Sequence, residues 1–140
     1  LEDLLEKDFL PVVFPVGIDK DGAAYNIKAD EAASSIATAL RAEKLAYLSD
    51  VEGVRLDPED PESVISELYT NEAQDLIEQG VISGGMLPKI ENCIDAINKG
   101  VSRVHIMDGR IPHGLLLEIF TNKGIGTAII KENEEKYWNE

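Results

Sequence analysis

Residues 44–53 read Lys-Leu-Ala-Tyr-Leu-Ser-Asp-Val-Glu-Gly, a β-prone apolar run that passes directly into a polar turn. Lys44 to Ser49 has the composition of a sheet strand, and Asp50 to Gly53 forms a loop at its carboxyl end. Open α/β sheets place ligands beside the carboxyl ends of their strands. This stretch therefore predicts a strand followed by a ligand-binding loop.

Helical patterns lie on both sides of this stretch. In residues 29–40 apolar side chains, mostly alanine, recur at helical spacing, and their small size predicts close packing on a sheet. A second helix is expected between Thr70, as its cap, and Gly80. A third helix follows Gly85, carries an apolar face and is expected to stop at Gly100.

Extended segments are expected near residues 64–68, at 103–107 and at 127–130, with a further helix at 113–120. Strands and helices thus alternate along the chain. This alternation predicts an α/β fold, a three-layer sandwich with a mainly parallel central sheet. Residues 131–140 are charged and lack a repeating apolar face, so we expect a tail or a terminal helix there.

The first residues carry a different pattern. Residues 10–18 form an apolar run with little alternation, which is typical of a strand buried on both faces, so we expect a central strand. A turn is expected at residues 19–22. Leu1, Leu4 and Leu5 already stand at helical spacing, and the first residue is not Met. We therefore expect the chain to be part of a longer protein.

The composition narrows the choice of partners. The chain has 140 residues, enough for one domain, and a net charge of −14 from 13 basic and 27 acidic residues. This charge repels nucleic acid and anionic membranes, so we expect neither, although local amides and a lysine can still bind a nucleotide. Cys93 is the only cysteine and no zinc-ligand spacing is present, which favours a cytoplasmic protein without metal-ligating residues. No apolar run is long enough to span a bilayer.

The clearest chemical feature is the entry to the third helix, Gly84-Gly-Met-Leu-Pro-Lys89, which places Lys89 in the first turn beside unpaired amide donors. A cation there costs about 0.3–1 kcal/mol against the helix dipole, unless an anion lies between the lysine and the amides. A phosphate would reverse that cost, which makes Lys89 a candidate phosphate ligand. The alternative is a solvated lysine that happens to fall in the first turn.

Other polar residues have structural as well as functional interpretations. Asn26 and Asp30 flank a strand-to-helix junction, where they can hold a carboxylate substrate and orient lysines, or only cap the helix. Asp50 with Gly53 is also common turn chemistry. His105 alternates with apolar residues on a strand, so a hydrogen-bonded, partly buried histidine is expected. The Walker loop, the dinucleotide fingerprint and the nucleophile elbow are absent.

Five blocks of sequence stand in a specific order and spacing. They are Pro15-Val-Gly-Ile-Asp19, Tyr25-Asn-Ile-Lys-Ala-Asp-Glu-Ala-Ala33, Leu48-Ser-Asp-Val-Glu-Gly-Val54, Gly80-Val-Ile-Ser-Gly-Gly-Met-Leu-Pro-Lys89 and His105-Ile-Met-Asp-Gly-Arg-Ile-Pro-His113. Together they resemble the amino acid kinase family, and within it the kinases of N-acetyl-L-glutamate, over residues 1–130. The resemblance implies that residues 1–130 are the C-terminal, ATP-binding lobe of an enzyme that phosphorylates the side-chain carboxylate of N-acetyl-L-glutamate in arginine synthesis.

The resemblance also implies roles for individual residues. Asn26 matches an asparagine that grips N-acetylglutamate, Asp30 an aspartate that organises two catalytic lysines, and Lys89 the second of those lysines. ATP, with Mg²⁺ on its phosphates, would be bound by eight residues: Asp50, Val51, Glu52, Gly53, Val54, Val81, Ile82 and Ser83. An arginine-inhibited branch of the family implies an effector site formed by His105, Glu118 and Gly124.

The chain departs from the family pattern in two respects. Lys28 stands where the family usually has Asn. The N-terminal half, with its glycine-rich phosphate loop and first catalytic lysine, is not in this chain, so we expect no turnover from it alone and homo-oligomers of the full-length protein. The alternatives are another amino acid kinase, such as a glutamate 5-kinase or a carbamate kinase, and a non-catalytic domain that senses arginine or a nucleotide.

Overall fold

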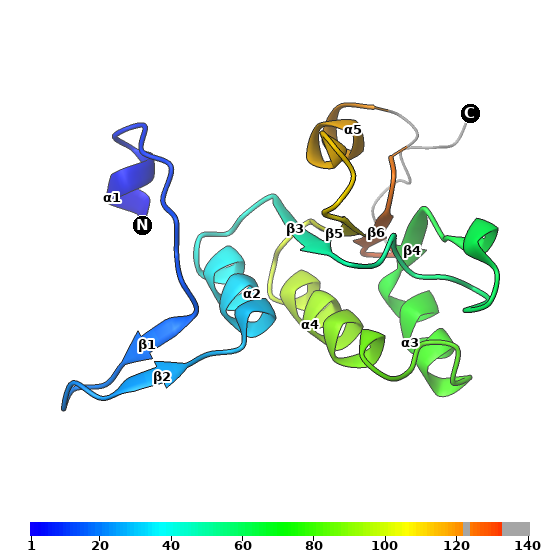
Figure 1. The fold of residues 1–140 in the computed structure, drawn as a ribbon, viewed down its shortest axis with the longest axis horizontal. Helices are drawn as coiled ribbons and strands as arrows, with labels where there is room; N and C mark the ends of the chain where they lie inside the picture. Colours follow the sequence, from blue (N-terminus) through cyan, green and yellow to red (C-terminus); the bar gives the residue numbers. More distant parts are fainter. Residues whose placement is uncertain (122–123, 133–140) are drawn as a thin grey trace.

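The computed structural model describes residues 1–121 and 124–132. Its centre is a four-stranded sheet in the order β3, β5, β6, β4 (Figure 1). The strands are β3 (Lys44–Ser49), β5 (Arg103–Asp108), β6 (Thr127–Ile130) and β4 (Glu67–Tyr69). β3 and β5 are parallel, as are β4 and β6, whereas β5 and β6 are antiparallel. The predicted α/β class with a mainly parallel sheet is confirmed.

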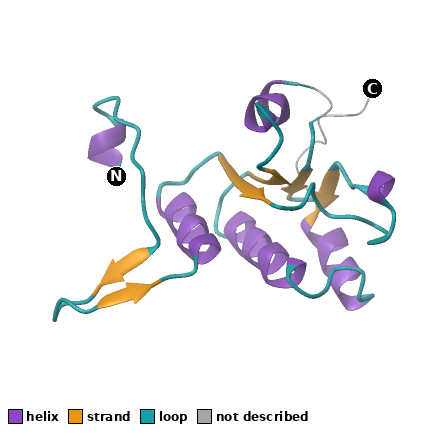
Figure 2. Cartoon of the chain, in the orientation of Figure 1, coloured by secondary structure: helices purple, strands orange, loops and turns teal. Residues whose placement is uncertain are grey.

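Helices cover both faces of this sheet. α2 (Ala29–Ala39), α3 (Thr70–Glu78) and α4 (Met86–Asn98) lie on one face, and α5 (Gly114–Phe120) lies on the other (Figure 1). Figure 2 separates the helical layers from the strands by colour. The predicted three-layer sandwich is therefore confirmed.

The hydrophobic core lies between α4 and the sheet. Ile90, Cys93 and Ile97 on α4 are at most 2% exposed, and they form one buried cluster with Val104 and Ile106 of β5. The three α4 residues are three and four positions apart, which places them on one side of a helix. Their spacing predicted this face, and the structure confirms it.

The helix ends agree with the sequence at their carboxyl sides. Gly80 follows α3 with φ 76° and Gly100 follows α4 with φ 108°, both in the left-handed region that favours glycine. The predicted cap at Thr70 is wrong by one residue, because α3 already begins with Thr70. The backbone N–H of Tyr69 instead donates to the carboxylate of Glu72 at 2.9 Å, so a residue inside the helix closes its first turn.

α2 buries only part of the side that its apolar pattern predicts. Ser34 and Ala37 are its buried residues, whereas Ile36 and Leu40 are only partly buried. The reason is that α2 packs beside α4 as well as over β3, which rotates the buried line around the helix. Small side chains along that line permit the close approach that the sequence suggested.

The predicted central strand at residues 10–18 is wrong. Within it only β1 (Val16–Ile18) is a strand, and it pairs with β2 (Ala24–Asn26) in an antiparallel hairpin outside the main sheet (Figure 1). Leu10 is 89% exposed and Phe14 is 75% exposed. An apolar run becomes buried only against a second apolar surface, and the described residues place none against this one.

The turn and the short helix near the start of the chain agree with the sequence. The carboxylate of Asp19 accepts the backbone N–H groups of Asp21 and Ala23, each at 2.9 Å, and Gly22 has φ 84°. α1 (Glu2–Leu5) precedes the hairpin. From residue 133 onward, the predicted tail lies outside the described residues. No helix within residues 1–121 and 124–132 combines the length and apolar composition that a membrane span requires.

Replacement of Ile97 by alanine is expected to destabilise the chain by roughly 2–5 kcal/mol, because it empties part of a filled core. Leu116→Ala serves as the control, since Leu116 on α5 is 54% exposed, and we expect a change within about 0.5 kcal/mol. Urea unfolding followed by circular dichroism measures both. Equal effects of the two substitutions would contradict the assignment of the core.

Candidate functional site

The first turns of α2 and α4 meet through an ion pair. Lys89 Nζ lies 2.5 Å from Asp30 Oδ2, although the two residues are 59 positions apart in the sequence. The side chain of Lys89 is only 16% exposed and that of Asp30 is 41% exposed. Lys89 therefore points into the junction of the two helices and not into open solvent.

Tyr47 of β3 contacts both residues of this ion pair. Its ring centroid lies 5.0 Å from Lys89 Nζ, and its hydroxyl donates to the backbone carbonyl of Asp30 at 3.1 Å. Burial, with further contributions from Cys93 and Asp30, raises the pKa of the Tyr47 hydroxyl above its ordinary value. Tyr47 therefore stays a neutral donor that holds Asp30 and Lys89 in place.

Cys93 lies one turn beyond Lys89 on α4 and belongs to the core. Burial raises the pKa of its thiol to about 12, against the opposing effect of Lys89. A thiol that stays protonated is neither a nucleophile nor a metal ligand. Cys93 is therefore a packing residue.

A cleft of about 380 Å³ opens beside the ion pair between α2 and α4. α4 has no acidic residue in its first turn, so the positive end of its dipole has no carboxylate of its own helix to balance it. Lys28, the departure from the family pattern, also lines this cleft, and its ammonium lies 3.1 Å from Glu31. The cleft residues are Lys28, Ala29, Asp30, Glu31, Gly85, Pro88, Lys89 and Asn92.

A second cleft, of about 320 Å³, lies at the carboxyl end of β3. All eight residues that the resemblance assigns to the nucleotide line it: Asp50, Val51, Glu52, Gly53, Val54, Val81, Ile82 and Ser83. Met86, in the first turn of α4, also lines this cleft, while Gly85 and Lys89 line the first one. The amino end of α4 is thus the common border of the two clefts.

The second cleft contains a residue that the sequence reasoning missed. Arg110 lines it, donates to both carboxylate oxygens of Asp108 at distances of 2.7–3.2 Å, and donates to the backbone carbonyl of Asp50 at 2.9 Å. Hydrogen bonds from Arg110 lower the pKa of Asp108 to about 2. Arg110 stands three residues after the predicted strand at 103–107, in the loop at its carboxyl end, so the rule that singled out Asp50 applies to it as well.

Asn26 is not brought into either cleft. It is exposed at the end of β2, opposite Val16 in the hairpin.

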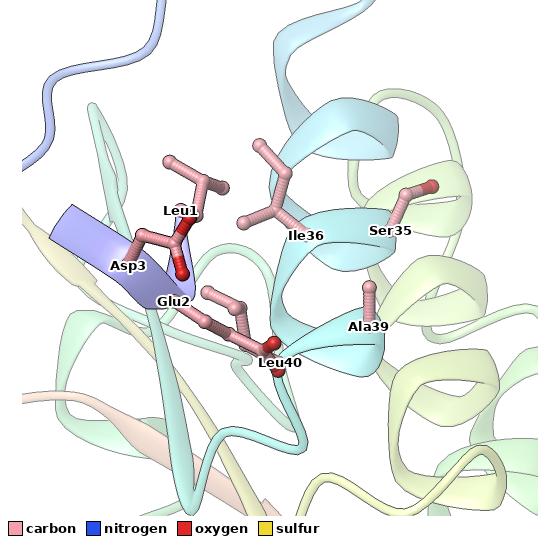
Figure 3. A pocket seen from close by; sticks show the side chains of 7 residues that line it. All are labelled: Leu1, Glu2, Asp3, Ser35, Ile36, Ala39 and Leu40. Carbon is pink, nitrogen blue, oxygen red and sulfur yellow. The ribbon is translucent and has the colours of Figure 1, made fainter. Parts of the chain in front are cut away.

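A further hollow of about 520 Å³ lies between α1 and α2 (Figure 3). Its residues are Leu1, Glu2, Asp3, Ser35, Ile36, Ala39 and Leu40, which include two carboxylates and no cation, so it lacks the charge that a phosphate needs.

The three residues of the expected effector site lie together between β5 and α5. His105 Nδ1 is 2.8 Å from Glu118 Oε1, and Glu118 Oε2 accepts the N–H groups of Ile125 and Gly126 at 2.7 and 3.1 Å. At Gly124, a Cβ atom would lie 2.9 Å from Glu118 Oε2. Both carboxylate oxygens of Glu118 are therefore engaged within the chain.

The charge state of this cluster follows from these contacts. Burial raises the pKa of Glu118, but the hydrogen bonds from His105, Ile125 and Gly126, together with the electrostatic interaction with His105, outweigh burial and leave the pKa below its ordinary value. His105 is 8% exposed, and its Nε2 atom is buried without a hydrogen-bond partner. The expectation of a partly buried, hydrogen-bonded histidine is met at Nδ1 alone.

No group of three or more His, Cys, Asp or Glu side chains gathers in metal-binding geometry anywhere in the part of the chain that the structure describes. The nearest candidates in the second cleft are the side chains of Asp50 and Glu52.

A family model and curated relatives show which proteins this chain resembles. The model of the "Amino acid kinase family" matches residues 1–108. The acetylglutamate kinase of Heliobacterium modesticaldum is 50% identical over 131 residues, which are 94% of this chain and 44% of that protein. The acetylglutamate kinase of Methanobrevibacter smithii is 56% identical over 131 residues, 94% of this chain and 45% of that protein. The chain spans about half the length of these curated relatives.

Solved structures share the fold. An N-acetylglutamate synthase from Neisseria gonorrhoeae, complexed with coenzyme A and N-acetyl-glutamate, has a TM-score of 0.86 and 33% identity over 95% of this chain and 30% of that one. The carbamate kinase of Giardia lamblia bound to AMP-PNP has a TM-score of 0.63 and 24% identity over 84% of this chain and 37% of that one, and it supports the fold alone.

These comparisons confirm the resemblance that the five sequence blocks carry. They leave the roles of single residues as predictions. Because the family model covers most of its length and curated relatives are about half identical to it, the chain belongs to the amino acid kinase family.

Proposed function

We propose that the chain is the nucleotide-binding half of an acetylglutamate kinase, which transfers the γ-phosphoryl group of ATP to the side-chain carboxylate of N-acetyl-L-glutamate. The observation that carries this proposal is the position of Lys89. Its ammonium is held by Asp30 at the amino end of α4, at the border of the two clefts. The names of the curated relatives support the choice of substrate.

The shape of the two clefts supports a specific placement of ATP. The apolar side chains of Val54, Val81 and Ile82 suit an adenine ring in the second cleft. A polyphosphate that leaves this cleft along α4 passes the positive end of the helix dipole and arrives at Lys89. The ligand would thus cross the common border of the clefts.

Lys89 then acts on the transferred group. An oxygen of the substrate carboxylate forms a bond to the γ-phosphorus while the bond to the β,γ-bridging oxygen breaks and ADP leaves. No proton needs to move, so the protein contributes position and positive charge. Lys89 and the amides of α4 neutralise the charge on the phosphoryl oxygens, and Asp30 keeps the ammonium in place. Mg²⁺, when bound, adds charge neutralisation on the ATP phosphates.

The rest of the proposal concerns the complete protein. Asn26 is assigned to the acyl-amino-acid substrate by resemblance, and its exposed place on the hairpin leaves it accessible to a ligand held by other parts of the enzyme. The phosphate loop and the first catalytic lysine belong to the other half, so this chain alone is expected to bind ATP without turnover. A cytoplasmic homo-oligomer is the expected form of the full-length enzyme.

A regulatory function has its own supporting observation. His105, Glu118 and Gly124 lie together, and the synthase of Neisseria gonorrhoeae, with a TM-score of 0.83 and 33% identity over 94% of this chain and 30% of that one, was solved with coenzyme A and L-arginine. A buried carboxylate suits a guanidinium group. Arginine would have to displace at least one of the contacts that Glu118 makes within the chain. We propose arginine as an inhibitor that binds this cluster.

Calorimetry on this chain tests the nucleotide site. We expect saturable binding of a non-hydrolysable ATP analogue with Mg²⁺, one molecule per chain, because both clefts lie within it. Titration with arginine alone is the comparison. If the chain binds arginine but not the ATP analogue, it is a sensory domain and not the nucleotide-binding half of a kinase.

The Lys89→Ala substitution in the complete enzyme is expected to lower kcat by about 100-fold to 1000-fold, because one charged group that stabilises the transition state is lost. Lys99→Ala is the matched control at the carboxyl end of the same helix, since Lys99 is 57% exposed and pairs with Asp95 one turn earlier. Steady-state assays with N-acetylglutamate and with glutamate measure the effect and the specificity. A modest loss with Lys89→Ala, or a preference for glutamate, would argue against the proposal.

Glu118→Gln is expected to weaken arginine binding at least about tenfold, because the neutral amide loses the charge that pairs with a guanidinium. Glu78→Gln, at an exposed position at the end of α3, is the control for the same chemical change. Calorimetric titration with arginine measures both variants. Unchanged arginine affinity in Glu118→Gln would remove this cluster as the effector site.

A further inference from the structure

The loop that lines the nucleotide cleft is tied to β6 by a closed ring of three hydrogen bonds. The backbone N–H of Val54 donates to Thr127 Oγ1 at 2.8 Å, and the Thr127 hydroxyl donates to the carbonyl of Ile65 at 2.6 Å. The N–H of Ile65 donates in turn to the carbonyl of Val54 at 2.8 Å. Thr127 is fully buried and Val54 is 1% exposed, so water does not substitute for these bonds.

The contact between the loop and Thr127 is also tight. A Cβ atom on Gly53 would lie 2.5 Å from Thr127 Oγ1 and 3.1 Å from its backbone nitrogen. Any side chain at this position would push the loop away from β6. Position 53 therefore requires glycine because Thr127 packs directly against it. This reason differs from the turn chemistry that the sequence around Gly53 suggests.

The opposite end of the loop has its own attachment. Arg110 donates to the carbonyl of Asp50 at 2.9 Å, and the N–H of Gly109 donates to the carbonyl of Ser49 at 2.8 Å. Residues after β5 thus hold the beginning of the loop, and Thr127 at the start of β6 holds its last residue, Val54. Both attachments lie at the edge of the sheet that faces the cleft. Thr127, at the start of β6, pairs with Ile106 near the carboxyl end of β5, which places it at this edge.

We propose that Thr127 is a positioning residue for the nucleotide, which acts by holding Val54, and with it the loop at residues 50–54, in the shape that receives ATP. Thr127 itself lines neither cleft, so its action passes through the loop. The inference rests on the proposed function in that the loop binds ATP. Only a hydroxyl can accept from Val54 and donate to Ile65 at once, so serine can replace threonine here and valine cannot.

The test compares Thr127→Val with Thr127→Ser in the complete enzyme that carries this chain. Thr127→Val leaves the buried N–H of Val54 without a partner, and we expect KM for ATP to rise about tenfold while KM for N-acetylglutamate stays unchanged. Thr127→Ser keeps the ring and is expected to stay within about threefold of the unsubstituted enzyme. Calorimetry with the ATP analogue should show the same ranking without turnover.

Thr70→Val is the matched control for the loss of a buried hydroxyl. Thr70 is 5% exposed, donates to Glu132 at 3.1 Å, and follows β4, whose carboxyl end lies at the sheet edge opposite the cleft. We expect Thr70→Val to lower the urea midpoint to a similar extent as Thr127→Val and to leave KM for ATP unchanged. A purely structural threonine at position 127 would give the same result as this control.

Three outcomes overturn the inference: an unchanged KM for ATP in Thr127→Val, an equal rise in Thr70→Val, or no rescue by serine. If Thr127→Val does not fold, Thr127→Ala removes the hydroxyl without the bulk of valine, and exchange of the Val54 amide hydrogen reports the ring directly. Exchange should accelerate in Thr127→Ala and not in Thr127→Ser. Absence of ATP-analogue binding in the unsubstituted protein would instead reject the proposed function.

Discussion

The contact on which the site depends is the ion pair of Lys89 and Asp30. Each residue stands in the first turn of a helix, where the dipole favours Asp30 and opposes Lys89. Their pairing at 2.5 Å joins α2 to α4, and Tyr47 of β3 contacts both partners from the sheet. The cation is thereby held at a helix end whose first turn carries no acidic residue of its own. Such an arrangement suits a ligand with several negative charges, since its phosphate oxygens meet the positive end of the α4 dipole and an ammonium already in position.

The second cleft shows how the sheet builds a ligand site from distant segments. The loop after β3 supplies one wall, the residues before α4 supply another, and the ends of β5 and β6 fix the loop through Arg110 and Thr127. The segment that holds Thr127 also contains Gly126, whose N–H is bound by Glu118. The nucleotide loop and the proposed arginine cluster therefore share a short stretch of backbone. Buried hydrogen bonds on this stretch thus tie together two candidate ligand sites in an otherwise strongly acidic molecule.

Residues 10–18 illustrate a limit of apolar patterning. Their composition matches that of a buried strand, and yet Leu10 and Phe14 are exposed, with β1 paired only to β2. Burial requires two apolar surfaces in contact, and the pattern of one segment describes only one of those surfaces. The chain covers about half the length of its curated relatives. The same reasoning explains α2, where the position of α4 selected Ser34 and Ala37 over the more apolar Ile36 and Leu40.

The sequence alone determined the fold class, the family, the order of the main helices and strands from residue 29 onward, and the clustering at one strand end of the residues that the resemblance assigns to a nucleotide. These follow from periodicity, from glycines at helix ends and from the rule for carboxyl ends of strands, all of which are carried by short stretches of chain. The resemblance implies that Asp30 acts on Lys89, and the tertiary structure gave the geometry of that pair; only the tertiary structure decided that Arg110 joins the cleft and that Thr127 holds Val54. Those contacts connect residues 59, 60 and 73 positions apart. No local pattern encodes such contacts, because they exist only once the sheet and helices have packed against one another.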